Sequence, residues 1–464
     1  MSESIWIHKC GINLWDRFRW IFCQLEVLRH CLPASVRRTL RELPESLDET
    51  YERILKEIKK PNRGLAQRVL QCLVVAIRPL QVSELAEVLA VDLDDSVGIP
   101  RLRADWRWDD QEQALMIACS SLIAIVEDGN SRVVQFSHFS VKEFLTSSRL
   151  SSTNGEVSAY RIDLENAHTI LAQACLGVLL QTYEEIDEDT SKDHPLARYA
   201  AQHWTTHAQL EEVSSRLQKG MECLFNPDRP HFSAWLRLYD IDTRPNYEAT
   251  FFASTPTTNK SAARPLYYAA LCGFHDLVEH LIAKYPQDAD ANGGYYMRPI
   301  IAALAGEHFQ TADLLRHNGA DPDVQGYRAR IPLHSAAWFE KLEAVQKLIE
   351  YDAEINARDM GGRTPLNLAS SGTRFKNGSV LRLLLECGAD VNSLANDGST
   401  PLHRASAFGA LEVVRVLIEY GADVEAVDHG GMTALQVVGK DASQMLDRGR
   451  CDEITRLLVE HGAK

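Results

Sequence analysis

Thr400-Pro401-Leu402-His403-Arg404-Ala405, followed by Gly421-Ala422-Asp423-Val424, is the clearest copy of a motif that occurs six times in the C-terminal part of the chain. Successive copies begin 34, 33, 33, 36 and 33 residues apart, at Arg264, Arg298, Ile331, Thr364, Thr400 and Thr433. A fixed period of this length is typical of one supersecondary unit per copy, with neighbouring copies stacking to bury a shared core. Residues 260–464 are therefore predicted to form a solenoid of six repeats.

The motif resembles the ankyrin repeat, in which a helix pair and a projecting turn recur about every 33 residues. The apolar positions of each copy are expected to lie between neighbouring repeats, as at Leu402, Ala405, Val413, Val414, Leu417 and Ile418. Glycines are expected to end helices with left-handed backbone, at Gly319, Gly388, Gly421 and Gly462. Extra residues around 373–378 and 440–449 are expected to form loops on one face of the array, either as part of a binding surface or as neutral drift.

The composition, 45% hydrophobic and 24% charged over 464 residues, fits two or three domains with substantial cores. No apolar run approaches the roughly 20 residues that span a bilayer, and the first residues are not expected to form a signal peptide. Ten scattered cysteines include no Cys-x-x-Cys pair, which predicts buried free thiols and neither a metal site nor a disulfide framework. The sequence thus predicts an intracellular protein, cytoplasmic or nuclear, without membrane association.

The net charge of −15 is unevenly distributed: residues 1–150 carry −1, residues 151–259 carry −8 and residues 260–464 carry −6. Phosphate-binding surfaces need concentrated positive charge, which none of these segments has. Direct binding of nucleic acid or of anionic membranes is therefore disfavoured.

The N-terminal half shows the element order of a winged helix. Ser46 and Glu49 predict a capped helix whose apolar stripe is Leu47, Tyr51, Ile54, Leu55 and Ile58. A second helix is expected over 65–77 and a third after Ser83. Two β-branched runs, 122–126 and 133–136, flank the turn sequence 127–130, and a capping box of Ser140 and Glu143 restarts a helix. The predicted domains are a segment 1–33, a winged-helix-like domain 34–150 and a helical arm with linker 151–259.

A winged helix could bind DNA, but its candidate recognition helix argues against that function. The candidate helix, residues 83–88, carries Glu84 and Glu87. A helix that reads the major groove of DNA carries Arg, Asn or Gln instead. A structural role is the favoured interpretation. The acidic stretch 184–189 is interpreted as a solvated loop, with an acidic docking segment as the alternative.

Several stretches of the N-terminal half resemble the region that follows the nucleotide-binding domain in fungal NACHT–ankyrin proteins of the STAND type. They include Phe18-Arg19-Trp20, Cys23-Gln24-Leu25 and residues 40–44, 46–55, 138–145 and 194–204. In that family a switch ATPase holds nucleotide, the winged helix and helical arm transmit its state, and the repeats bind a ligand. The resemblance implies that 1–33 is a remnant of the region after a NACHT domain, and that His138 falls where a histidine could touch a bound diphosphate.

The chain departs from the family pattern at the phosphate-binding loop. No segment reads G-x-x-x-x-G-K-[ST]; the Gly439-Lys440 pair is followed by Asp441. The sequence therefore looks like a truncated member of the family, and no nucleotide or other cofactor is expected. His138 is expected to be a satisfied core histidine.

The predicted function is protein–protein interaction without catalysis, because no catalytic motif or metal-ligand cluster is found in the sequence. Binding is expected at positions that the repeat does not need for stacking, where aromatic residues and arginines often dominate affinity. The candidates on turns are Tyr327, Arg330, Arg363 and His429, and those on helices are Tyr268, Trp338, Phe339, Arg404 and Phe408. Trp338 is the strongest candidate, with packing against a neighbouring repeat as its alternative role.

Three kinds of partner remain open from the sequence. The first is a protein docked by an adaptor through the repeats. The second is a transcription factor, for an ankyrin coregulator in a fungal gene cluster that does not itself touch DNA. The third is an intact NACHT protein, for a remnant or decoy of an innate sensor that associates through residues 15–210.

Overall fold

The computed structural model describes residues 46–93, 98–129, 131–152, 155–181, 194–242, 264–294, 296, 298–323, 331–371, 378–438 and 448–463. The chain divides into an N-terminal unit, Met1–Ile241, and a C-terminal unit, Asp242–Lys464, and each is described by itself. The predicted segment 1–33, the acidic stretch 184–189, the predicted linker and most of both insertions lie outside the described residues. The domain boundaries remain predictions.

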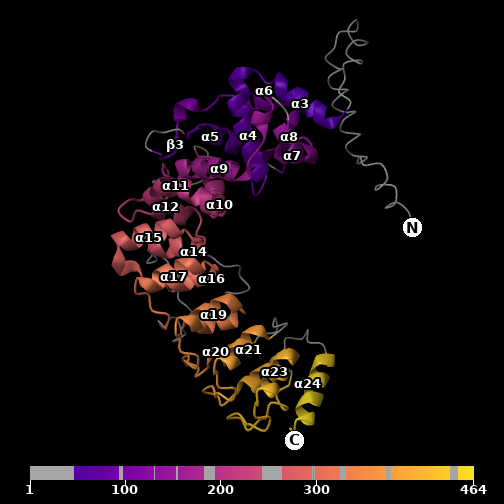
Figure 1. Ribbon diagram of the computed structural model, residues 1–464, viewed down its shortest axis with the longest axis vertical. Helices are drawn as coiled ribbons and strands as arrows, with labels where there is room; N and C mark the ends of the chain where they lie inside the picture. The colour runs from indigo at the N-terminus through magenta and orange to yellow at the C-terminus, as the bar shows by residue number, and fades with distance from the viewer. Residues whose placement is uncertain are drawn as a thin grey trace, which may run out of the picture. The chain divides into compact units, whose positions relative to one another are not determined.

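The N-terminal unit begins with a small α/β domain (Figure 1). Its helices are α3 (Leu47–Glu57), α4 (Arg63–Val75), α5 (Val82–Leu89), α6 (Gln111–Cys119), α7 (Phe139–Thr146) and α8 (Arg149–Ser152). Its strands are β1 (Leu80–Gln81), β2 (Val91–Asp92), β3 (Arg101–Leu102), β4 (Ile123–Asp128) and β5 (Ser131–Phe136). The sheet has the antiparallel order β1-β5-β4, and β2 pairs with β3. Helices α4, α5 and α6 followed by the β4–β5 hairpin give the predicted winged-helix architecture.

Local sequence signals account for the ends of several elements. Ser46 Oγ accepts a hydrogen bond from the Glu49 amide at 3.2 Å, as predicted, and Tyr51 and Leu55 on the inner face of α3 are each only 1% exposed. In the hairpin Asp128 pairs with Ser131, so the turn has two residues, and Gly129 adopts φ +60°. That conformation favours glycine, which is why Asp-Gly was a reliable turn signal.

Two predicted helix starts are wrong. Helix α7 is capped by His138, whose Nδ1 accepts from the Ser140 amide at 3.3 Å, and not by Ser140 itself. The Ser140 hydroxyl is buried and lies 2.8 Å from the Tyr51 hydroxyl, because that tyrosine needs a polar partner inside the core. Helix α5 begins at Val82 and not after Ser83, since the Glu84 carboxylate accepts from the Gln81 amide at 2.8 Å.

A helical arm completes the N-terminal unit. It consists of α9 (Leu164–Leu179), α10 (Ala197–Ala208), α11 (Glu211–Leu224) and α12 (His231–Leu238). Helix α9 is central and packs on α4, α10 and α11. Trp204 and Trp235 are fully buried, and their rings pack edge to face with centroids 5.3 Å apart. The Trp235 Nε1 donates to the Ala201 carbonyl at 3.0 Å. The arm therefore has an aromatic core of its own.

A buried polar chain joins the arm to the winged helix. The Tyr199 hydroxyl lies 3.0 Å from His207 Nε2, and His207 Nδ1 lies 2.9 Å from His168 Nδ1. The backbone amide of Ile77 donates to the same tyrosine hydroxyl at 3.3 Å. Burial, with smaller effects of His168 and His203, lowers the pKa of His207 to about 3. The imidazole is thus held neutral in the folded protein.

The C-terminal unit stacks helix pairs in chain order (Figure 1). Repeats 1 to 5 contain α14 (Pro265–Cys272) and α15 (His275–Lys284), α16 (Pro299–Ala305) and α17 (Phe309–His317), α18 (Pro332–Trp338) and α19 (Leu342–Glu350), α20 (Pro365–Ala369) and α21 (Ser379–Glu386), and α22 (Pro401–Ala407) and α23 (Leu411–Glu419). In repeat 6, residues 434–438 form turns, and α24 (Arg448–Glu460) follows.

Hydrogen bonds between consecutive repeats hold the array in register. His334 Nε2 donates to the Arg363 carbonyl and His403 Nε2 to the Met432 carbonyl, each at 2.9 Å, so each histidine binds the last residue of the turn that leads into the next repeat. The predicted stacking residues Leu402, Ala405, Val413, Val414 and Leu417 are buried, and Ile418 is half-buried. The predicted glycines end their helices with φ between +83° and +102°. These residues therefore stabilise the stacking of the repeats.

Four of the seven described cysteines are buried as free thiols: Cys72, Cys119, Cys175 and Cys272. Burial in apolar surroundings raises the pKa of Cys72 and of Cys119 to about 12. These side chains act as small apolar core residues.

Candidate partner-binding surface

The turns that lead into repeats 4, 5 and 6 share one geometry, and we call residues 358–363, 394–399 and 427–432 the finger turns. In each, the second residue donates its amide to the carbonyl of the last: Asp359 to Arg363 at 2.9 Å, Ala395 to Ser399 at 3.0 Å and Asp428 to Met432 at 3.0 Å. Neighbouring finger turns are also joined, since the Asn396 amide donates to Gly361 and the His429 amide to Asp397. The three turns therefore present corresponding residues in register.

Arg363, a predicted binding residue, has a structural contact in its own finger turn. Its guanidinium lies 2.8 Å from the Asp359 carboxylate, which is fully buried. The same carboxylate accepts the amides of Gly361 at 2.8 Å and Arg363 at 3.0 Å. Because Arg363 neutralises a buried charge, its removal would disturb the turn as well as any bound partner.

Arg404 braces a helix against a finger turn. Its Nη2 lies 2.7 Å from the Asp397 carboxylate, and its Nε donates to the Ser399 hydroxyl at 3.0 Å. About a quarter of the side chain is exposed. His429 is exposed at the tip of the last finger turn, so of these candidates it is the most open to a partner.

The expected exposure of Tyr268 is wrong. The residue is 1% exposed and packs edge to face with Tyr267 at 5.2 Å. Helix α14 is buried on nearly all sides because α15 and α16 both pack on it, so its tyrosines belong to the core. Sequence alone could not separate an apolar inner helix from one with an open face.

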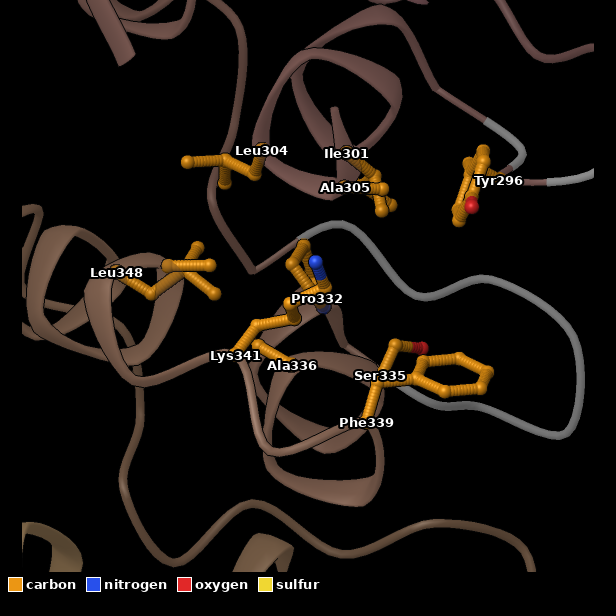
Figure 2. A pocket seen from close by; sticks show the side chains of 11 residues that line it. Tyr296, Ile301, Leu304, Ala305, Pro332, Ser335, Ala336, Phe339, Lys341 and Leu348 are labelled. Atoms are coloured by element: carbon orange, nitrogen blue, oxygen red, sulfur yellow. The ribbon is translucent and has the colours of Figure 1, made fainter. Parts of the chain in front are cut away.

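The remaining helix candidates, Trp338, Phe339 and Phe408, are all half-buried. Phe339 lines a pocket between repeats 2 and 3 (Figure 2). Trp338 is neither fully packed nor fully open, which leaves both of its predicted roles as proposals. Tyr327 and Arg330 lie outside the described residues.

Sequence reasoning missed three exposed apolar residues on the finger turns. Met360 is 71% exposed, Leu394 48% and Val427 55%. Leu394 and Val427 occupy the same position of consecutive turns, the position held by exposed Arg358 in the first finger turn. Aligning the copies by their first residues would have shown apolar side chains in turn positions that need none. Together these residues, with Asn396 and His429, form what we call the finger patch.

The helix that the sequence offered as a recognition helix, α5, is mostly buried. Glu84 and Glu87 on α5 are only 3% and 2% exposed. Glu84 pairs with Arg78, while Glu87 lies 2.6 Å from Arg107 and accepts the Leu196 amide at 2.6 Å. Glu84 thus stabilises the start of α5, and Glu87 joins the winged helix to the arm, in line with the structural role that the sequence favoured.

No group of three or more His, Cys, Asp or Glu side chains that could hold a metal ion occurs among the described residues. Within the same residues, no helix is both long enough and apolar enough to cross a membrane.

The fold and this surface define a protein with a winged-helix domain followed by ankyrin repeats. The family model for ankyrin repeats (3 copies) matches residues 300–393, 333–428 and 373–464, and that for the GPI inositol-deacylase winged helix domain matches 51–157. Both predicted architectures are thereby confirmed, and ankyrin repeats support a role in protein–protein interaction.

Among curated relatives, the azaphilone pigments biosynthesis cluster protein L of Monascus ruber is 31% identical over 296 residues, which cover 61% of this chain and 61% of that protein. The ankyrin repeat and SOCS box protein 5 of Mus musculus is 36% identical over 120 residues, 26% of this chain and 34% of that protein. The putative ankyrin repeat protein FPV115 of fowlpox virus is 25% identical over 211 residues, 44% of this chain and 37% of that protein. The chain therefore spans about three fifths of the first relative and about a third of the other two.

Proposed function

We propose that this protein is a non-catalytic adaptor that docks a protein partner on the finger patch of its ankyrin repeats. The observation that carries the proposal is the register of exposed side chains on consecutive finger turns. Met360, Leu394 and Val427 stay in water although the turns could carry polar residues there, and burying them would contribute favourable free energy to an interface.

The N-terminal unit would supply a rigid second element in this adaptor. Its winged helix and arm are joined by Glu87 and by the Tyr199–His207–His168 chain, so they would move as one body. Free buried thiols fit residence in a reducing compartment, which supports an intracellular location for the protein.

The test of this proposal is partner capture by the full chain expressed in its own cells, with chemical cross-linking before purification. Replacing Met360, Leu394 and Val427 together by Ser should abolish capture of proteins that the wild type retains. The matched control replaces three exposed apolar residues of the other unit, Ile117, Leu164 and Leu210, by Ser and should leave capture unchanged. Equal capture by both triple variants would contradict the finger-patch mechanism.

A second candidate function is favoured by the Monascus ruber relative, whose name describes a biosynthesis cluster protein. In this version the docked partner is a transcription factor, and the protein is a coregulator that never contacts DNA. Chromatin immunoprecipitation would then recover cluster promoters with the wild type but not with the finger-patch triple variant. The relation to NACHT proteins, including a decoy role, stays a prediction from the sequence.

A further inference from the structure

The junction between repeats 2 and 3 contains a pocket of about 270 Å³. Its walls come from α16, α18 and α19, and Leu304 and Leu348 lie at one end while Tyr296 and Phe339 lie at the other (Figure 2). The lining is mostly apolar, with Ile301, Ala305, Pro332, Ala336 and Ala344 completing it beside Ser335 and Lys341. Elsewhere the first helices of neighbouring repeats pack directly, α14 on α16, α18 on α20 and α20 on α22.

The size of this pocket suits one large side chain. An apolar cavity of about 150 Å³ already admits benzene. A pocket of 270 Å³ can therefore receive the side chain of Leu, Phe or Trp from outside. Because the walls are apolar, insertion would bury carbon against carbon and leave few polar groups without water.

The same junction carries two residues in an unfavourable backbone conformation. Glu307 and Glu340 adopt φ values of +63° and +54° in the turn between the two helices of repeats 2 and 3. In repeats 1 and 5 the equivalent turn, with the same backbone hydrogen bonds, has Gly273 at +74° and Gly409 at +67°. A side chain in this conformation costs free energy relative to glycine, and such costs concentrate at functional sites.

The two glutamates differ in their partners. Glu307 forms an ion pair with Lys341 of the next repeat, and this pairing lowers the pKa of the carboxyl. Glu340 is half-buried, and its carboxylate has no hydrogen bond or ion pair within the described residues. Burial raises the pKa of Glu340. Its neighbours in the sequence, Phe339 and Lys341, both line the pocket. Within the part of the chain that the structure describes, a carboxylate without a countercharge therefore lies next to pocket-lining residues.

We propose that the junction of repeats 2 and 3 receives one large apolar side chain of the partner protein in this pocket, and that Glu340 pairs with an arginine or lysine next to that side chain. The inference deepens the proposed adaptor function and rests on it. It states the chemistry of the partner: an apolar anchor with a basic neighbour. The complementary charge on the array side is Glu340, because Glu307 is already neutralised by Lys341.

Defined peptides test this chemistry on the full chain. The probe is fluorescein-labelled Gly-Ser-Arg-Phe-Arg-Ser-Gly, followed by fluorescence anisotropy. One control peptide has Ala in place of Phe, and a second has Glu in place of both Arg. Both controls should bind at least tenfold more weakly than the probe. Equal binding of the probe and either control, or no binding of the probe, would overturn the proposal.

Variants of Glu340 separate binding from folding. In Glu340→Gly the relief of strain outweighs the added freedom of the unfolded chain, so Tm should stay constant or rise, while the probe should bind about fivefold to tenfold more weakly. Glu340→Gln should weaken binding of the probe by the same factor and leave Tm unchanged. The matched control is Asp352→Gly, an exposed acidic residue at φ +63° outside the pocket lining, which should leave probe binding within twofold.

Two results with these variants would refute the role of Glu340: probe binding that survives both Glu340 substitutions, or a loss in Glu340→Gly that merely follows a drop in Tm. The adaptor function can be judged separately, because partner capture in cells depends on the finger patch. Capture that is lost in the finger-patch variant, combined with failure of the peptides, would sustain the adaptor and reject the pocket.

Discussion

The two units of this protein bury their polar groups in different ways. In the N-terminal unit, Glu87 accepts an amide 109 residues away, and the Tyr199 hydroxyl accepts one 122 residues away. In the C-terminal unit, His403 reaches a carbonyl only 29 residues away, and Asn367 one only 26 residues away. Because its contacts are long-range, the first unit is expected to unfold in a single all-or-none transition. In the second unit each repeat contacts mainly its neighbours, so its stability is expected to be a sum of similar local contributions.

The largest effect that would test this difference is expected for Glu87→Ala. The substitution leaves the Leu196 amide without its acceptor and Arg107 without its countercharge, which should cost the N-terminal unit about 3 kcal/mol. Hydrogen exchange measured along a urea series on the full chain would show the loss in both α5 and α10. Exchange in α14–α23 should not change; a loss confined to α5 would contradict the all-or-none picture.

A smaller effect is expected from pH. Because the folded-state pKa of His207 lies at about 3, below its unfolded value of 6.5, the unfolded state binds the extra proton. The stabilising contribution is complete above pH 6.5 and is lost as pH falls toward 3, at about 1.4 kcal/mol per pH unit for one proton. Urea unfolding between pH 7 and pH 5 should show this slope in the N-terminal unit.

The control for the pH effect is His207→Gln, which cannot take up the proton and should make that slope shallower by the same amount. An identical slope in the variant would show that other groups cause it. The C-terminal unit of the same samples should be indifferent to the substitution.

The smallest effect is expected for His403→Ala in the array. The variant loses the hydrogen bond to Met432 and the contact with Thr400, at a cost of about 1–2 kcal/mol. Hydrogen exchange should become faster in α22–α24 and stay unchanged in α14. Faster exchange along the whole array would mean that the repeats are more cooperative than their short-range contacts suggest.

The sequence predicted best the features that depend on local chemistry. The Ser46 cap, the Asp-Gly turn and the helix-ending glycines follow from short-range rules that the structure obeys. The predictions from the sequence were wrong where a residue's role depends on a partner far away in the chain. Ser140 forms a hydrogen bond with the Tyr51 hydroxyl and does not cap a helix, and α16 packs on the helix that carries Tyr268. The pocket between repeats 2 and 3 could not be predicted, because it arises from how two helices stack and not from any motif.

The buried thiols give this protein its own chemical reporters. A thiol attacks an alkylating reagent only as an exposed thiolate, so Cys72, Cys119 and Cys175 can react only when the N-terminal unit opens, and Cys272 only when repeat 1 opens. Mass spectrometry after timed iodoacetamide labelling would therefore read opening rates in both units of one unmodified chain. The cysteines thus allow the transient opening of each unit to be measured without an engineered label.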